Sequence, residues 1–243
     1  MNDEPTIVLL PGNMCDERMW ADILSAISDR TTRYHLPIEC TIEAMARSCL
    51  DTVPGQLIPV GFSMGGIVAL AIADMAPERV TALSMIATNA HADRPERAHE
   101  RRRQQRAVMA GDLSKVIADE LKPAYFAERN RSDGTLHTRV LDMAIALGPE
   151  VFVAQSEALR TRRDYGDSLA TVDIPAFIAC GAQDALCPPA LHERMAARMS
   201  DSELHIVPGA GHMLPLEQPR ILGALLSDWL GRTRKDTRWP IAS

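Results

Sequence analysis

The chain has 243 residues, a length that suits one domain or a domain carrying an inserted subdomain. Hydrophobic residues make up 46% and charged residues 24%, as in folded globular proteins, and the formal net charge of −6 argues against a basic nucleic-acid-binding surface. We therefore expect a small-molecule substrate and no nucleic-acid partner.

The first predicted elements are a buried strand and an amphipathic helix. An apolar, β-branched run at residues 6–10 predicts a strand that ends at Pro11-Gly12. Asp16 is the candidate cap of a helix that runs to about Ser28. Its buried stripe, at helical spacing, would contain Met19, Trp20, Ile23, Leu24 and Ile27.

Strand-like and helix-like segments then alternate along the chain. Further strands are predicted at residues 31–36, 56–61, 80–87, 176–180 and 204–207. Further helices are predicted at residues 41–52, with Thr41 as N-cap, and at 67–75, 188–199 and 219–230. Alternation of this kind predicts an α/β fold, in which helices cover both faces of a mostly parallel sheet.

The alternation stops between residues 91 and 167, where polar helical segments replace the strand-like runs. We interpret residues 91–167 as an inserted helical cap, called the cap segment below, and residues 1–90 with 168–243 as the core. The cap segment is expected to cover the carboxyl edge of the sheet, where such sheets bind ligands. It is rich in arginine, and we interpret most of these side chains as a solvated helix face rather than as a site for an acidic substrate.

One motif places a serine between a strand and a helix. Gly61-Phe62-Ser63-Met64-Gly65 matches G-x-S-x-G, in which a nucleophile occupies a strained turn whose neighbours must lack bulky side chains. The turn also directs the N-terminus of the following helix, with its partial positive charge, toward a developing oxyanion. Ser63 is therefore the candidate nucleophile.

Two further loops supply the partners that a serine nucleophile needs. His212, in Gly209-Ala210-Gly211-His212, follows the last predicted strand and is the candidate base. Asp184 follows the preceding strand and is the candidate carboxylate that orients the histidine, with Asp93 as a second possibility. The chain order Ser, Asp, His is that of α/β-hydrolases and not of chymotrypsin-type or subtilisin-type enzymes.

The sequence resembles the α/β-hydrolase superfamily, in particular its small capped esterases, lactonases and carbon–carbon bond hydrolases. The motifs that carry the resemblance are Leu10-Pro11-Gly12-Asn13, Gly61 to Gly66, Gly181-Ala182-Gln183-Asp184 and Gly209-Ala210-Gly211-His212. Five residues before Thr6 leave no room for the first two strands of the family, so a sheet of about six strands is expected. The family's His-Gly is here Pro11-Gly12.

The resemblance also implies functional residues and a reaction. The loop after the first strand would give one oxyanion N–H, from Asn13 with Met14 as the neighbouring candidate, and Met64 would give the other. Met14, Leu186 and Met213 are the candidate substrate-binding residues. The expected reaction is hydrolysis of an ester, lactone or thioester through an acyl-enzyme on Ser63. Carbon–carbon bond hydrolysis or other non-ester chemistry, and ligand binding on a hydrolase fold, remain alternatives.

No cofactor or metal is expected. The five cysteines form no pattern of zinc-ligand spacing, and we interpret them as reduced, mostly buried thiols: Cys15, Cys40, Cys49, Cys180 and Cys187. No apolar run approaches the roughly 18 residues that cross a bilayer, and acids stand where an export signal has positive charge. We therefore expect a cytoplasmic protein without membrane contact, as a monomer or homodimer.

Overall fold

The computed structural model describes residues 4–27 and 30–236, with side chains described up to residue 233. Ser28, the predicted end of the first helix, lies outside the described residues. Within the described ranges, no helix has both the length and the apolar character that a membrane crossing requires.

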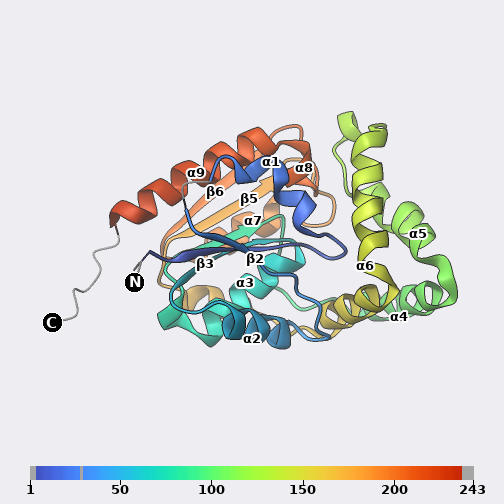
Figure 1. Cartoon of the computed structure of the whole chain (residues 1–243), viewed down its shortest axis with the longest axis horizontal. Helices are drawn as coiled ribbons and strands as arrows, with labels where there is room; N and C mark the ends of the chain where they lie inside the picture. The colour runs from blue at the N-terminus through green and yellow to red at the C-terminus, as the bar shows by residue number, and fades with distance from the viewer. Residues whose placement is uncertain (1–3, 28–29, 237–243) are drawn as a thin grey trace.

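A six-stranded parallel sheet forms the centre of the molecule (Figure 1). Its strands lie in the order β2-β1-β3-β4-β5-β6, which confirms the predicted parallel sheet of about six strands. In chain order they are β1 (Thr6–Leu10), β2 (Thr32–Tyr34), β3 (Leu57–Phe62), β4 (Leu83–Ile86), β5 (Ala176–Gly181) and β6 (Ser202–Val207). The strand order reverses after β2, so the carboxyl ends of β1 and β3 flank the position where such folds bind ligands.

Helices cover both faces of the sheet, and alternate strand residues bury into different apolar clusters. One cluster contains Val8 and Leu10 of β1, and the other contains Ile7 and Leu9, as the two-residue period of a strand requires. The first face is covered by α2 (Ile42–Thr52), α3 (Met64–Met75) and α7 (Pro189–Ala196). The second is covered by α1 (Ala21–Leu24), α8 (Leu214–Glu217) and α9 (Pro219–Asp236).

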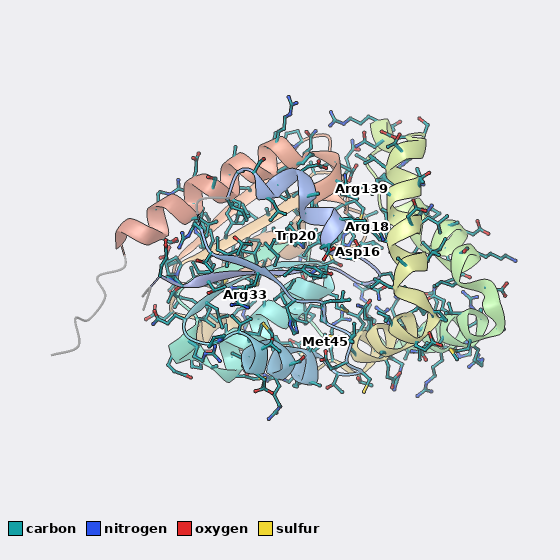
Figure 2. The ribbon with its side chains drawn as sticks, in the orientation of Figure 1. Asp16, Arg18, Trp20, Arg33, Met45 and Arg139 are labelled. Atoms are coloured by element: carbon teal, nitrogen blue, oxygen red, sulfur yellow. The ribbon has the colours of Figure 1, made fainter. Side chains whose placement is uncertain are left out.

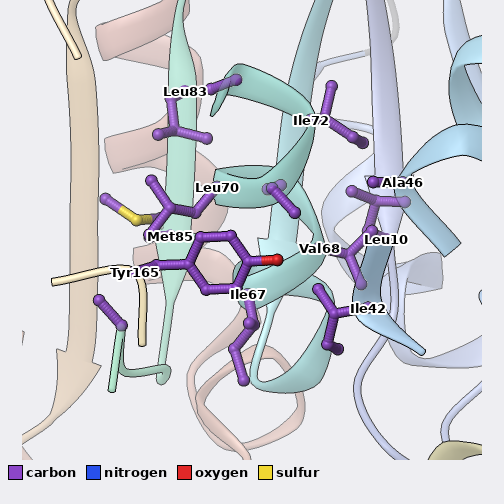
Figure 3. Packing of buried hydrophobic residues seen from close by; sticks show 14 of the residues in the cluster. Leu10, Ile42, Ala46, Ile67, Val68, Leu70, Ile72, Leu83, Met85 and Tyr165 are labelled. Carbon is purple, nitrogen blue, oxygen red and sulfur yellow. The ribbon is translucent and has the colours of Figure 1, made fainter. Parts of the chain in front are cut away.

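The helix α3 is the most deeply embedded of these helices, and Figure 3 shows its side chains packed among those of the neighbouring elements. Residues 64–73 of this helix are all buried. Its Ile67, Val68 and Leu70 belong to the same cluster as Ile42 of α2 and Met85 of β4. The position of the α3 N-terminus is therefore fixed by close packing on several sides.

The cap segment forms a separate group of helices at one side of the core (Figure 1). Its helices are α4 (Pro95–Ala107), α5 (Leu113–Lys115) and α6 (Gly134–Thr161). Wider turns at Val108–Asp112 and Val116–Leu121 flank α5, and short 3-10 turns follow at Lys122–Ala124 and Glu128–Asn130. The helix α6 is interrupted at Gly148, where φ is 83°, and Pro149 follows.

The cap segment also makes polar contacts with the first helical segment of the core. Figure 2 shows Arg139 of α6 close to Arg18, which lies two residues after Asp16. The Arg139 Nη1 donates to Asp22 Oδ2 at 2.7 Å, and Arg18 Nη2 donates to the Asp142 carbonyl oxygen at 3.0 Å. These contacts hold the start of α6 against the core.

The first predicted helix differs from its expected form. A 3-10 turn at Glu17–Trp20, capped by Asp16, precedes the short α1, so the segment is not one continuous α-helix. Three residues per turn change the direction in which successive side chains point, and Leu24 is 41% exposed although the stripe predicted it to be buried. The other stripe residues, Met19, Trp20, Ile23 and Ile27, are buried.

Candidate active site

The turn that carries Ser63 has the backbone of a strained strand-to-helix junction. Ser63 lies between β3 and α3 with φ 51° and ψ −115°, a backbone conformation that residues other than glycine rarely adopt. A Cβ at Gly61 would lie 2.2 Å from the Gly65 carbonyl oxygen, and one at Gly65 would lie 2.1 Å from the Leu10 carbonyl oxygen. Both flanking glycines are thus required by close backbone approach.

Hydrogen bonds on both sides hold the strained serine in place. The Ser63 N–H donates to the Ile86 carbonyl oxygen at 2.8 Å, and the Thr88 hydroxyl donates to the Ser63 carbonyl oxygen at 2.6 Å. The Thr88 N–H in turn donates to His192 Nε2 at 3.0 Å. Burial lowers the pKa of His192 to about 4, so this imidazole is neutral and accepts the bond near neutral pH.

His212 lies between Ser63 and Asp184. Its Nε2 is 3.0 Å from Ser63 Oγ, and its Nδ1 is 2.9 Å from Asp184 Oδ2. The imidazole is 4% exposed, and its ring centroid is 5.3 Å from that of Phe62 and 5.9 Å from that of Tyr125 in the cap segment. Two aromatic rings and two hydrogen bonds fix the orientation of this histidine.

Asp184 is a buried carboxylate, and each of its two side-chain oxygens has a hydrogen-bond partner. Its Oδ2 faces His212, while Oδ1 accepts the N–H groups of Leu186 at 2.9 Å and Cys187 at 2.8 Å. Because a carboxylate at Nδ1 favours the tautomer with a proton there, Nε2 is left to accept the proton of Ser63. The arrangement can therefore activate a serine hydroxyl as a nucleophile.

The three residues suggested as oxyanion donors lie at the same edge, but their N–H groups are not equally free. The Met14 N–H donates to Gln155 Oε1 at 2.8 Å, so it is engaged. The Asn13 side chain also donates to Gln155, at 3.2 Å, while the Asn13 backbone N–H has no acceptor among the described residues. Met64 is the first residue of α3, where a helix leaves its N–H groups without an intrahelical partner. The backbone N–H groups of Asn13 and Met64 are thus the available pair.

The candidate substrate-binding residues fall in two places. The Met14 side chain is buried in a cluster of cap-segment residues that includes Val116 and Phe152. Met213 belongs to a different cluster, which also contains Tyr125, and Leu186 packs against that cluster. The structure therefore places Met213 and Leu186 at the same large apolar cluster of the core, and Met14 with the cap segment.

A buried carboxylate that the sequence analysis did not single out connects the histidine loop to the cap segment. Glu217 Oε1 accepts the Gly211 N–H at 2.8 Å, and Oε2 accepts the Ala127 N–H and the Asn130 side-chain amide, each at 2.8 Å. Glu217 is only 8% exposed. The signal in the sequence is an acid placed directly after the apolar run that follows His212.

Asp93, the second candidate for the orienting acid, is engaged elsewhere. Its carboxylate accepts from Arg101 Nε at 2.5 Å and lies 3.2 Å from Arg162 Nη1. Burial alone would raise the pKa of the Asp93 carboxyl, but the hydrogen bond from Arg101 and the charges of both guanidiniums lower it. Two other arginines of α4 also face acids, since Arg103 pairs with Glu120 and Arg97 with Glu100.

Four of the five cysteines are buried, and burial disfavours ionisation of their thiols. Burial raises the pKa of four thiols to about 12, those of Cys15, Cys49, Cys180 and Cys187. Over the part of the chain that the structure describes, no group of three or more His, Cys, Asp or Glu side chains could hold a metal ion.

Two curated relatives match most of this chain at low identity. A putative 2-succinyl-6-hydroxy-2,4-cyclohexadiene-1-carboxylate synthase of Bacillus subtilis is 26% identical over 179 residues, 70% of this chain and 64% of the relative. A pimeloyl-[acyl-carrier protein] methyl ester esterase of Neisseria meningitidis serogroup A is 27% identical over 198 residues, 79% of this chain and 62% of the relative. The chain thus spans less than two thirds of the length of either relative.

Solved structures agree with the fold over nearly the whole chain. A thermophilic esterase from Thermogutta terrifontis has a TM-score of 0.86 at 27% identity and covers 95% of this chain and 90% of its own. An enol-lactonase from Burkholderia xenovorans LB400 has a TM-score of 0.80 at 20% identity, and the match covers 93% of this chain and 91% of the lactonase chain. The alpha/beta hydrolase family matches residues 7–224, and with the sheet order and the serine turn this confirms the predicted resemblance: the chain belongs to the alpha/beta hydrolase family.

Proposed function

We propose that the protein is a serine hydrolase that cleaves an ester, lactone or thioester of a small molecule through an acyl-enzyme on Ser63. The observation that carries the proposal is the continuous hydrogen-bonded chain from Ser63 Oγ through His212 to Asp184. The esterase names of several relatives and structural neighbours support the choice of reaction class.

The first half of the reaction forms the acyl-enzyme. His212 Nε2 takes the Ser63 proton while Oγ bonds to the substrate carbonyl carbon, and the carbonyl π electrons move to its oxygen. The imidazolium then gives that proton to the leaving oxygen or sulfur as its bond to carbon breaks. Asp184 keeps the ring in one tautomer and stabilises the imidazolium.

The second half releases the acid. A water molecule gives a proton to His212 and attacks the acyl carbon, and collapse of the tetrahedral intermediate returns the proton to Ser63. In both halves the Asn13 and Met64 N–H groups stabilise the negative oxygen. The N-terminus of the closely packed α3 adds its partial positive charge at the same place.

The cap segment supplies the boundary of the substrate pocket in this proposal. Tyr125 packs on His212, and the Met213 N–H donates to the Tyr125 carbonyl oxygen at 3.1 Å. The apolar cluster around Met14 would contact one part of the substrate, and Leu186 with Met213 would contact another. A cap over the serine excludes water and strengthens the oxyanion contacts.

A second candidate is non-ester chemistry with the same three residues. The relative from Bacillus subtilis carries the name of a carboxylate synthase, and this favours keeping elimination or carbon–carbon bond cleavage as the alternative. A screen of esters, lactones and thioesters of graded acyl length distinguishes the candidates, because only a hydrolase of the proposed class turns several of them over.

The decisive experiment compares Ser63→Ala and His212→Ala with the wild type on the best substrate of that screen. Each variant should lower kcat by about 10⁴-fold or more, and the double variant should be hardly worse, because nucleophile and base act as a unit. Ser114→Ala and His99→Ala, which change exposed cap-segment residues, are the matched controls. A fluorophosphonate should label the wild type stoichiometrically at Ser63.

Additive losses for the two substitutions would show that the residues do not share one step. Substrate binding without turnover, and without labelling of Ser63, would instead identify a binding protein.

A further inference from the structure

Gln155 is a polar side chain buried completely within an apolar stripe of the cap segment. On α6 the buried residues Phe152, Gln155, Ser156 and Leu159 follow helical spacing, and Gln155 is 0% exposed. A primary amide removed from water is strongly destabilising unless its groups are hydrogen-bonded. The contacts of this amide therefore indicate why it lies here.

The amide group of Gln155 binds two loops of the core at once. Its Oε1 accepts the Met14 N–H at 2.8 Å and the Asn13 Nδ2 at 3.2 Å. Its Nε2 donates to the Pro37 carbonyl oxygen at 2.7 Å. Two donors lie on one side and a carbonyl on the other, so only one orientation of the amide satisfies all three contacts.

The segment that Gln155 holds is itself strained. Met14 has φ 55°, and its side chain packs with cap-segment residues, 2% exposed. A methionine in this region of backbone space is maintained only where its surroundings over-determine it. The hydrogen bond from Met14 to Gln155 and the packing of its side chain are the surroundings that do so.

This arrangement determines which N–H group of the loop remains available to the substrate. The Met14 N–H and the Asn13 side-chain amide both point to Gln155, so the Asn13 backbone N–H is the donor left without a partner in the described structure. The position of the Asn13 N–H depends on the peptide groups on either side of Asn13. Gln155 holds the peptide group that joins Asn13 to Met14, because it accepts the Met14 N–H.

We propose that Gln155 is a positioning residue for the oxyanion site, through which the cap segment sets the place of the Asn13 N–H. The inference rests on the proposed function, because it assumes a tetrahedral intermediate on Ser63. Gln155 itself touches no reacting atom in this account. Its effect should appear when negative charge develops on the carbonyl oxygen and not when the substrate binds.

Gln155→Met tests the proposal, since methionine has a similar length but can neither accept nor donate these bonds. Loss of one oxyanion donor lowers kcat by about 10²- to 10³-fold, so a misplaced donor should lower it by about 10- to 100-fold, with KM nearly unchanged. Gln105→Met is the matched control, because Gln105 is also a cap-segment glutamine and donates to the neighbouring Ser156 at 3.2 Å. It should leave kcat unchanged.

A pair of inhibitors separates positioning from a general loss of structure. A trifluoromethyl ketone bearing the alkyl chain of the best substrate adds to Ser63 and creates an oxyanion, whereas the matching methyl ketone binds as a ground-state mimic. In Gln155→Met the affinity for the trifluoromethyl ketone should fall by the same factor as kcat/KM. The affinity for the methyl ketone should stay the same. Equal losses for both ketones, or an unchanged kcat in the folded variant, would overturn the proposal.

If Gln155→Met does not fold, Gln155→Asn provides the test. It keeps a neutral amide but is one methylene shorter, so it cannot reach the Met14 N–H and the Pro37 carbonyl oxygen together, and the ratio of the two ketone affinities should fall below that of the wild type. A folded Gln155→Asn protein that keeps the wild-type ratio overturns the proposal. Failure of the proposed function is recognised separately, because Ser63→Ala would then retain turnover whatever Gln155 does.

Discussion

The carboxyl edge of the sheet and the cap segment differ in which residues adopt a positive φ. At the edge, positive φ occurs at Gly209 and also at Met14, Ser63 and Ala87, which are the only non-glycine residues with such values in the described chain. In the cap segment it occurs at Gly111 and Gly148. Strain is therefore concentrated where the proposed chemistry takes place, and the cap segment turns without it.

The difference follows from what surrounds each position. Ser63 is held by Ile86 and Thr88, Ala87 donates to the Ala179 carbonyl oxygen at 2.7 Å, and Met14 donates to Gln155. By contrast, a Cβ built on Gly111 would meet no atom within 4 Å. At the edge, hydrogen bonds thus hold non-glycine residues in a positive φ, whereas the cap segment places glycine at such turns. Substitutions at the edge should affect catalysis most, and those far out on the cap segment least.

After the nucleophile and the base, the largest effect is expected for Asp184→Asn. An asparagine keeps the shape but favours the wrong histidine tautomer, so kcat should fall by about 10⁴-fold on the best ester. Substrate affinity and the thermal unfolding midpoint should change little by comparison. Steady-state kinetics with purified protein measures the effect.

Asp93→Asn is the control for this substitution, because Asp93 binds two arginines and not His212. It should preserve kcat while lowering stability, since it leaves buried guanidiniums less well paired. If Asp184→Asn retained activity and Asp93→Asn lost it, the orienting role would belong to Asp93.

A smaller effect on kcat is expected at the junction of the two regions, for Glu217→Gln. The carboxylate accepts three N–H donors on two oxygens, so a glutamine must turn its NH₂ group toward at least one of them. We expect the loop before His212 to shift and kcat to fall by about tenfold or somewhat more, with a loss of about 1–3 kcal/mol in unfolding free energy. Glu128→Gln, at an exposed residue of the same contact region, should change neither.

A full kcat in Glu217→Gln would mean that the histidine loop keeps its position without the cap segment. Gln155 and Tyr125, whose ring packs on His212, would then be the remaining connections between the cap segment and the proposed chemistry.

The sequence predicts the edge well because its requirements are local. Apolar runs define the strands, and Gly61 and Gly65 are needed where two backbones approach within a few residues of Ser63. The geometry of this strand-to-helix turn therefore follows from a short motif. Asp184 and His212 are expected at the same edge because each follows a strand of one parallel sheet.

The contacts between cap segment and core escape such reasoning because their partners are distant in sequence. Gln155 and Met14 are 141 residues apart, and Ala127 and Glu217 are 90 apart. A lone glutamine on an apolar stripe signals a buried hydrogen bond but not its partner. For the same reason the sequence could not separate Asn13 from Met14 as the available N–H donor.

The stability of the edge should also depend on pH. Burial lowers the pKa of His192 from 6.5 to about 4 in the folded protein. Below pH 6.5 the unfolded chain binds a proton that the folded protein does not, so stability falls with decreasing pH until about pH 4. Between pH 7 and pH 4.5 this one group should remove about 2 kcal/mol of unfolding free energy.

His192→Gln should reduce that loss, because its amide oxygen can still accept the Thr88 N–H but does not titrate. Urea unfolding of both proteins at several pH values measures the difference. An equal acid loss in both would show that His192 is not the responsible group. The carboxylates of the edge would then be the candidate groups.

The smallest effect is expected for Arg139→Gln, at the exposed contact between α6 and the first helical segment (Figure 2). The Arg139 and Asp22 side chains are 28% and 50% exposed, and an ion pair in such solvent contributes about 0.2–1 kcal/mol and weakens with added salt. Arg18 still donates to the Asp142 carbonyl oxygen in the variant, so α6 keeps a second contact with the core. We therefore expect an unfolding midpoint slightly below that of the wild type at low salt, a difference that shrinks at high salt, and an unchanged kcat. If Arg139→Gln instead lowered kcat as far as Gln155→Met does, the outer part of the cap segment would also position reacting groups. The contrast between an edge that determines kcat and an outer cap segment that does not would then be wrong.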